Sequence, residues 1–279
     1  MRIAIIGAGW LGLPLAQDLA NGGHTVFASK QTEEGAISIT TPHLFGFACP
    51  LPETYDASFA SQLAMQLKEW NIEAVVGAFP PGFRRNQGSN YQFQWQTLVK
   101  ACVEAKISKL VMVSATSVYP SGEGVMREEQ ASLTLAQTET EFSDKAKILL
   151  QAEQHVIDSG IKFAIIRASG LYGSDRHPSR FVAKLSSISE KAPANMLHKL
   201  DAIGVCHWAL ENIDNRVVNA TSPSTTNKAE FYRQALISRN IDQALPEVNQ
   251  TPDKTISSDL LLSLGYEFKI EHTVDGFYL

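Results

Sequence analysis

The sequence predicts an α/β fold, a doubly wound parallel sheet with a small, discontinuous cap formed by C-terminal segments. Short apolar segments bounded by turn residues alternate with segments of helical periodicity, as at residues 74–79 and 90–105. This alternation is typical of parallel sheets that helices cover on both faces. A glycine-rich turn at residues 7–12, between the first predicted strand and the first helix, makes the predicted sheet Rossmann-type.

The opening segment carries the strongest pattern. Residues 3–6 predict a buried strand, residues 11–19 a helix and residues 24–28 a second strand. The turn after the first strand holds three glycines in the pattern G-x-G-x-x-G, which are Gly7, Gly9 and Gly12. Strand, glycine turn, helix and strand in this order are the context of a dinucleotide-binding turn. The alternative is a turn that only permits close packing.

Each glycine has a separate expected role. Gly7 allows the tight turn, Gly9 lets the backbone approach a pyrophosphate, and Gly12 lets the helix pack on the strand. The N-terminus of the helix offers N–H groups and partial positive charge to the same anion. We expect dinucleotide contacts from this turn and from the ends of later strands, namely Gly7, Gly9, Trp10, Leu11, Gly12, Ser29, Lys30, Phe79, Pro80 and Ser114.

The end of the second predicted strand indicates which dinucleotide is bound. An NAD-binding turn usually has Asp or Glu about 20 residues on, which binds the ribose 2′-hydroxyl. Ser29 and Lys30 stand there instead, and a hydroxyl and an ammonium suit a 2′-phosphate. We therefore predict NADP, with NAD as the second choice. Alternatively, Lys30 is only a surface charge, and Glu33 and Glu34 weaken the positive field.

The middle of the chain continues the alternation. Residues 57–70 predict a helix and residues 74–79 a buried strand, which a Pro-Pro-Gly segment at residues 80–82 ends. Loops at the carboxyl ends of strands face the ligand crevice in such sheets, so this loop should pass the cofactor. Arg84 and Arg85 follow in it, and they either hold a phosphate or are solvent-exposed charges.

Composition narrows the class of protein. The 279 residues carry a net charge of −5, which gives no basic footprint for nucleic acid. No long apolar stretch predicts a membrane span, and the three cysteines, without a C-x-x-C pair, are typical of buried thiols in a reducing compartment. We expect a cytoplasmic protein with a small-molecule substrate, no metal cluster, and a homodimer as its assembly.

The strand at residues 109–113 runs into Ser-Ala-Thr-Ser-Val-Tyr at residues 114–119. This segment resembles the extended short-chain dehydrogenase/reductases, the NAD-dependent epimerase/dehydratase family. Similar family segments lie at residues 165–173, 175–181, 195–201 and 264–268. Together they resemble an atypical, YeeZ-like branch. The resemblance implies NAD(P)-dependent oxidoreductase or epimerase chemistry on a small polar or phosphorylated, sugar-like carbonyl compound.

The chain departs from this family at the catalytic helix. The family uses Tyr-x-x-x-Lys, which places an acid/base tyrosine and a lysine on one helix face. Here the expected helix contains Lys145 and Lys147, with Glu141 and Ser143 four residues before them. Two interpretations follow. The protein is an enzyme with a rebuilt acid/base, or it is a catalytically silent NADP-binding sensor or regulatory module.

A rebuilt site has few candidates. Thr116 or Ser114 would donate a hydrogen bond to the substrate carbonyl, and Tyr119 is the preferred proton donor, with His177 and Lys147 as others. A buried tyrosine bonded to a backbone carbonyl is the alternative for Tyr119.

Candidate substrate contacts come later in the chain, and they are Arg176, His177, Arg180 and His198. A helix that opens at Pro178 beside two arginines would favour an anionic substrate group. The alternative is a helix start with exposed charges. His198 either contacts substrate or links a strand to the helix predicted at residues 201–210, for which Asp201 is the expected N-cap.

We expect two domains, with residues 1–168 and about 201–220 binding the nucleotide. The cap would comprise residues of about 169–200 and 221–279, with helices at 227–239 and 257–264 and a loop at 246–254. A hydroxyacid dehydrogenase is a third possibility that needs an all-helical C-terminal half. The strands predicted at residues 216–220 and 266–270 argue against it.

Overall fold

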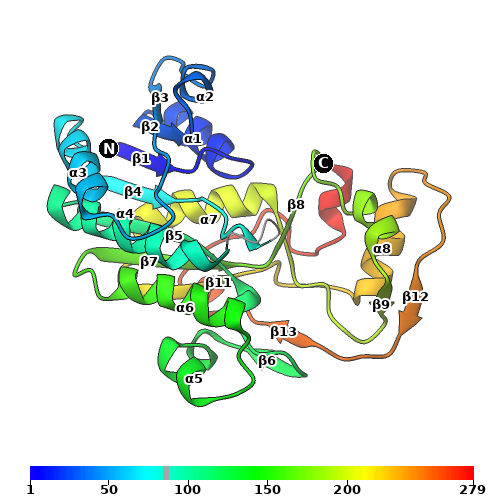
Figure 1. Cartoon of the computed structure of the whole chain (residues 1–279). Coiled ribbons are helices and arrows are strands. Elements are labelled where there is room, and N and C mark those ends of the chain that lie inside the picture. The colour runs from blue at the N-terminus through cyan, green and yellow to red at the C-terminus, as the bar shows by residue number, and fades with distance from the viewer. Residues whose placement is uncertain (84–87) are drawn as a thin grey trace.

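The centre of the molecule is a seven-stranded parallel sheet in the order β11-β7-β5-β4-β1-β2-β3 (Figure 1). The computed structural model describes residues 1–83 and 88–279. The strands of this sheet are β1 (Arg2–Ile6), β2 (Thr25–Lys30), β3 (Leu44–Ala48), β4 (Ala74–Gly77), β5 (Lys109–Ala115), β7 (Lys162–Ala168) and β11 (Arg216–Ala220). The order reverses between β1 and β4, which makes their carboxyl ends the switch point for ligands. The predicted doubly wound α/β fold is confirmed.

Alternate residues of each strand pack against opposite layers of helices. In β1, Ala4 and Ile6 lie in one apolar cluster while Ile3 and Ile5 lie in the other. The first cluster is completed by α3 (Ala57–Glu69), α4 (Tyr91–Ala105) and α6 (Asp144–Ile157). The second is completed by α1 (Gly12–Asn21), α7 (Lys199–Asn212) and α9 (Asp259–Ser263). Burial on both faces explains why these strands are almost entirely apolar.

Smaller elements extend beyond the sheet, and α8, β9 and β12 lie to its right in Figure 1. Three two-stranded parallel sheets pair β8 (Gly170–Tyr172) with β10 (Met196–His198), β9 (Ser187–Ser189) with β12 (Glu247–Asn249), and β6 (Gly124–Met126) with β13 (Lys254–Ile256). The remaining helices are α2 (Glu33–Ile37), α5 (Leu133–Thr138) and α8 (Lys228–Ile237). A third apolar cluster, here called the cap cluster, contains Tyr172, Ala194, Phe231, Ala235 and Phe277.

The C-terminal part differs from the prediction in three respects. Residues 266–270 form no strand, and their segment lies beside α7. The loop predicted at residues 246–254 contains β12 and the first residue of β13. The helix α9, predicted as part of the cap, packs through Leu261 in the second cluster of the main sheet, together with Tyr266 and Phe268.

Asp201 explains part of this difference. Its fully buried carboxylate accepts hydrogen bonds from the backbone N–H groups of Lys269 (2.7 Å) and Ile270 (2.9 Å), so these groups bond to a side chain instead of a neighbouring strand. Asp201 is therefore not the N-cap of α7. His198 is the N-cap, and its Nδ1 accepts from the N–H of Leu200 at 3.3 Å.

The contact between β4 and α4 leaves no room for a side chain at Gly77, because an added Cβ would lie 2.2 Å from Cη2 of Trp95. We expect Gly77→Ala to lower the free energy of unfolding by roughly 1–3 kcal/mol through overpacking. Gly22→Ala is the matched control, because its nearest contact is 3.4 Å, and it should cost less than about 1 kcal/mol. Urea unfolding of the two variants measures the difference, and equal losses would contradict this account.

Candidate functional site

The glycine turn is fixed by the end of β2. The N–H of Ala8 donates to the carbonyl of Ser29 (2.8 Å), and the N–H of Gly7 donates to Oγ of Ser29 (2.9 Å). Gly7 has φ of +99°, and a Cβ there would lie 2.7 Å from the backbone nitrogen of Phe79. At Gly12 a Cβ would lie 2.2 Å from the carbonyl oxygen of Gly7. Both positions therefore require glycine.

Gly9 is different, because a Cβ there would meet no protein atom within 4 Å. The space in front of Gly9 is open to a ligand, as expected of a backbone that approaches a pyrophosphate. The helix α1 begins directly afterwards with no side-chain cap and no acidic residue in its first turn. Its N-terminus therefore presents N–H groups and positive potential at the switch point of the sheet. These residues fit a dinucleotide.

The end of β2 holds the two residues predicted to select NADP. Ser29 is buried, and its hydroxyl accepts from Gly7, so it supports the turn instead of facing a 2′-phosphate. Lys30 is half-buried as the last residue of β2, and the exposed Gln31 follows it. The first carboxylate after β2 belongs to Glu33, an exposed residue at the start of α2.

The loop after β4 passes the glycine turn as predicted. The backbone of Phe79 borders Gly7, whereas its ring stacks on Trp95 with centroids 5.0 Å apart. Pro80 is exposed beside it. Arg84 and Arg85, the predicted phosphate contacts of this loop, lie outside the described residues.

Two of the three catalytic candidates are engaged in a buried polar network. Oγ of Ser114, near the end of β5, donates to Oε1 of Glu153 at 2.6 Å. The hydroxyl of Tyr119 donates to Oδ1 of Asn219 (2.6 Å) and accepts from Nη1 of Arg167 (3.0 Å). Burial raises the pKa of Tyr119, so its proton is held more tightly than in water. This arrangement does not suit Tyr119 as a proton donor.

Thr116 remains half-buried in the 3₁₀ turn η3 (Thr116–Val118), directly after β5. On α6, Lys147 is half-buried, and Nζ of Lys145 lies 5.8 Å from the ring centroid of Phe83. Lys145 therefore reaches toward the loop after β4, which borders the glycine turn. Among the described residues, Thr116, Lys145 and Lys147 therefore remain as candidates for chemistry near the ends of β4 and β5.

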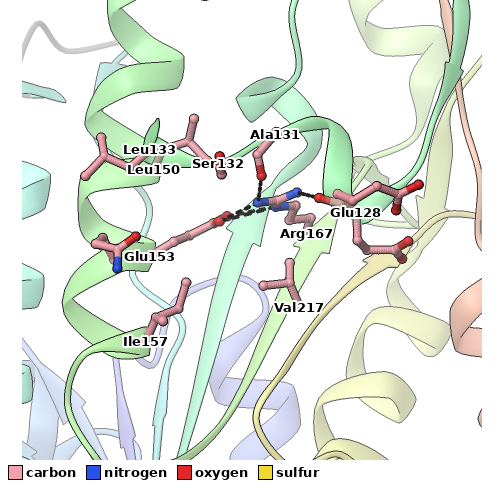
Figure 2. A pocket seen from close by; sticks show the side chains of 11 residues that line it. Glu128, Ala131, Ser132, Leu133, Leu150, Glu153, Ile157, Arg167 and Val217 are labelled. Carbon is pink, nitrogen blue, oxygen red and sulfur yellow. Dashed lines mark hydrogen bonds and ion pairs between the residues drawn. The ribbon is translucent and has the colours of Figure 1, made fainter. Parts of the chain in front are cut away.

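The network centres on an ion pair between Arg167 of β7 and Glu153 of α6, 2.7 Å apart, with each side chain only 2% exposed (Figure 2). The guanidinium also donates to the backbone carbonyls of Glu128 (2.9 Å) and Ala131 (2.8 Å). A cavity of about 210 Å³ lies beside it, and Figure 2 shows Leu150 and Val217 in its lining. Nε, Nη1 and Nη2 of Arg167 each donate to acceptors of this network, so the side chain is fully engaged in holding these segments together.

The histidines proposed as substrate contacts serve as caps. His177 is 2% exposed, its Nδ1 accepts from the N–H of Ser179 (3.3 Å), and its ring packs on Phe277 at 5.2 Å. It caps the 3₁₀ segment η5 (Pro178–Lys184). His198 caps α7, and burial lowers the pKa of both rings, so both favour the neutral form.

Of the two arginines, Arg176 lies beside the glycine turn. Cζ of Arg176 lies 5.4 Å from the ring centroid of Trp10, and Arg180 donates to the backbone carbonyl of Asp175 at 2.9 Å. Nζ of Lys199, at the start of α7, lies 4.9 Å from the same ring and forms an ion pair with Asp175 at 2.8 Å. The sequence analysis missed the place of Lys199 beside the glycine turn, because nothing in the pattern links residue 199 to residue 10.

Four buried polar atoms at the carboxyl edge of the sheet have no hydrogen-bond partner among the described residues, and they are Nε1 of Trp10, Oγ of Ser169, Oγ of Ser222 and Nε2 of His198. Ser169 follows β7, and Ser222 follows β11. Unpaired buried groups are costly, so they mark places where water or a ligand supplies the missing bonds.

No helix within residues 1–83 and 88–279 combines the length and apolar character that crossing a membrane requires. In the same residues no group of three or more His, Cys, Asp or Glu side chains could hold a metal ion. The cysteines Cys49, Cys102 and Cys206 are buried free thiols.

The sheet order, the bare glycine turn and the uncapped α1 define a dinucleotide-binding α/β protein. The chain matches the NAD(P)H-binding family over residues 49–195, and it belongs to that family.

Individual relatives agree with this assignment. The chain is 26% identical to Protein YeeZ of Escherichia coli K12 over 277 residues, which covers 96% of each protein. Among solved structures it is similar to a UDP-glucose 4-epimerase of Thermotoga maritima with UDP-glucose, at a TM-score of 0.76 and 14% identity. That alignment covers 100% of this chain and 97% of the epimerase chain. It is also similar to a dTDP-glucose 4,6-dehydratase of Bacillus anthracis in complex with NAD, at a TM-score of 0.77 and 15% identity. That alignment covers 100% of this chain and 94% of the dehydratase chain. The resemblance drawn from the sequence is confirmed, and the solved structures share its fold.

Removing one partner of the buried pair should be costly. Arg167→Met leaves the Glu153 carboxylate unpaired, so we expect the free energy of unfolding to fall by about 3–5 kcal/mol. The double variant Arg167→Met/Glu153→Leu should recover much of this loss. Arg127→Met is the control, since its partner Asp259 is exposed and the pair should contribute less than about 1 kcal/mol. Urea unfolding tests this, and a mild effect of Arg167→Met alone would refute it.

His177 should make stability depend on pH. Burial, with Arg239 and Arg180 nearby, lowers its pKa to about 4 in the folded protein, whereas the pKa in the unfolded chain is about 6.5. The unfolded chain therefore binds the proton first, and the free energy of unfolding should fall by about 1–3 kcal/mol as pH decreases between these values. Below the pKa of His177 in the folded protein, both the folded and the unfolded state bind the proton, so this histidine lowers the free energy of unfolding no further.

The variant His177→Asn keeps an acceptor for the N–H of Ser179 and removes the titration. Urea unfolding across that pH window should give a flatter dependence for this variant than for the parent, whereas His43→Asn, at an exposed histidine, should keep the parent's slope. A slope unchanged by His177→Asn would exclude this role.

Proposed function

We propose that this protein binds NADP at the glycine turn and carries out epimerase/dehydratase-like redox chemistry on a small, polar or phosphorylated carbonyl compound of sugar-like type. The observation that carries the proposal is the turn itself. Gly7 and Gly12 have no space for a side chain, while Gly9 faces open space in front of an uncapped helix. A pyrophosphate is the anion that this combination accepts best.

The preference for NADP over NAD is supported by charge at the end of β2. Lys30 is the last residue of the strand, and no carboxylate precedes Glu33. A 2′-phosphate placed there would be attracted by the ammonium, whereas the ribose hydroxyl of NAD would lack its usual carboxylate acceptor. NAD is the second choice. Ser29 supports this preference less directly than predicted, because its hydroxyl holds Gly7.

When bound, the nicotinamide would accept or supply hydride, and this chain's residues would orient the substrate. Thr116, directly after β5, would donate a hydrogen bond to the substrate carbonyl. Lys145 or Lys147 on α6 would supply the nearby positive charge. Arg180 would meet an anionic group of the substrate from the exposed side of its loop.

A second function is favoured by a specific observation. The hydroxyls of Ser114 and Tyr119 are committed to the network around Arg167, and α6 lacks Tyr-x-x-x-Lys. A catalytically silent NADP-binding sensor fits these facts. A panel of carbonyl compounds, followed at the nicotinamide absorbance, separates the two functions, because turnover supports the enzyme and binding without turnover supports the sensor.

Titration of NADPH and NADH by fluorescence tests the cofactor. We expect the parent to bind NADPH about tenfold or more tightly than NADH, and Lys30→Glu to remove this preference. Lys191→Glu, at an exposed lysine far along the chain, makes the same change in net charge and should keep it. A Cβ at residue 9 would meet no protein atom within 4 Å, so Gly9→Val should fold normally and lose its affinity for both NADPH and NADH. Tighter NADH binding by the parent would overturn the preference, and full binding by Gly9→Val would overturn the site.

A further inference from the structure

Trp10 connects the glycine turn to segments far along the chain. It lies between Gly9, whose Cα faces open space, and Leu11, whose side chain is buried in the second cluster. Nζ of Lys199 lies 4.9 Å and Cζ of Arg176 lies 5.4 Å from the centroid of its half-buried ring, within the range of cation–π contacts. Two cations therefore stand beside the residue that lines the open side of the turn.

The surroundings of these cations are tightly built. Gly173 packs on Lys199, since a Cβ at Gly173 would lie 3.1 Å from Cβ of Lys199. The carboxylate of Asp175 forms an ion pair with Lys199 at 2.8 Å, and this contact lowers the pKa of Asp175. The loop after β8 and the first residue of α7 thus meet at Trp10.

Among the described residues, Arg176 and Lys199 place two positive charges at the ring of Trp10, and Asp175, the ion-pair partner of Lys199, places a negative charge beside them. The first turn of α1, directly beside them, contains no acidic residue and no side-chain cap. Two positive side chains at Trp10 and the N-terminus of α1, which begins two residues further along the chain, both favour an anion in this region.

We infer that Arg176 and Lys199 bind the pyrophosphate of the dinucleotide from the side opposite the glycine turn, with Trp10 as the platform that aims them. This inference rests on the proposed function, and it assigns Arg176 to the cofactor instead of the substrate. The guanidinium matches phosphate oxygens in a bidentate geometry, and the ammonium of Lys199 exchanges Asp175 for the phosphate. Main-chain N–H groups hold one side of the pyrophosphate, and the two cations hold the other.

Binding of ADP-ribose, measured by calorimetry at several salt concentrations, tests the inference. ADP-ribose carries the pyrophosphate and lacks the nicotinamide, so no turnover is involved. Arg176→Gln and Lys199→Gln should each weaken binding about tenfold and make it less sensitive to salt. Asp175→Asn frees Lys199 and should tighten binding by a factor of roughly 2–5. Lys100→Gln, at a lysine paired with Glu104 on α4, should leave it unchanged.

Anion binding predicts that Asp175→Asn raises the affinity for ADP-ribose while Lys199→Gln lowers it. If the ion pair were only structural, both variants would change the affinity in the same direction. Thermal unfolding of each variant without ligand identifies any that fold poorly. If Arg176→Gln or Lys199→Gln folds poorly, the affinity of Asp175→Asn for ADP-ribose tests the inference, and an affinity no higher than the parent's overturns it. Parental affinity in both Arg176→Gln and Lys199→Gln would overturn the inference and leave the proposed function standing. Failure of the parent to bind either ADP-ribose or NADPH would overturn both.

Discussion

The ion pair between Arg167 and Glu153 holds one half of the crevice in place. It joins β7 to α6, and its hydrogen bonds extend to Ser114 on β5, to Tyr119, and to the carbonyls of the segment before α5. A charge pair buried this deeply is stable only when its geometry is complete. The hydroxyls of Ser114 and Tyr119, which the sequence analysis offered as catalytic candidates, are part of that geometry, so they are held by the ion pair.

The sheet could be predicted because its strands obey one constraint. Burial on both faces makes the interiors of strands such as β1 and β5 apolar, at residues 3–6 and 110–113, and glycine at residues 7 and 12 is forced by close contacts of the backbone. Residues 266–270 alternate apolar and charged side chains, as a half-buried strand does, without being a strand. Their backbone N–H groups bond to Asp201, a partner far away in the sequence, and no local pattern announces such a partner.

The site was less predictable than the fold for the same reason. Spacing alone singled out Gly9, which the structure shows facing open space, whereas the contacts of Trp10 with Arg176 and Lys199 depend on how distant segments meet. One signal was available and unused. An arginine inside the apolar segment of β7 has to find a buried partner, so Arg167 itself pointed to an acidic residue such as Glu153. Serine hydroxyls near such a pair are more often engaged by it than free for substrate.

The segment after α9 also has a consequence for biosynthesis. Asp201 fixes Lys269 and Ile270 under α7, the hydroxyl of Tyr172 donates to the carbonyl of Thr273, and Phe277 completes the cap cluster. On the ribosome the glycine turn emerges long before this segment, and the cap cluster stays incomplete until residue 277 has left the exit tunnel. A frameshift or premature stop near residue 266 would remove Phe268 from the second cluster and Phe277 from the cap cluster, and quality-control proteases would degrade the product.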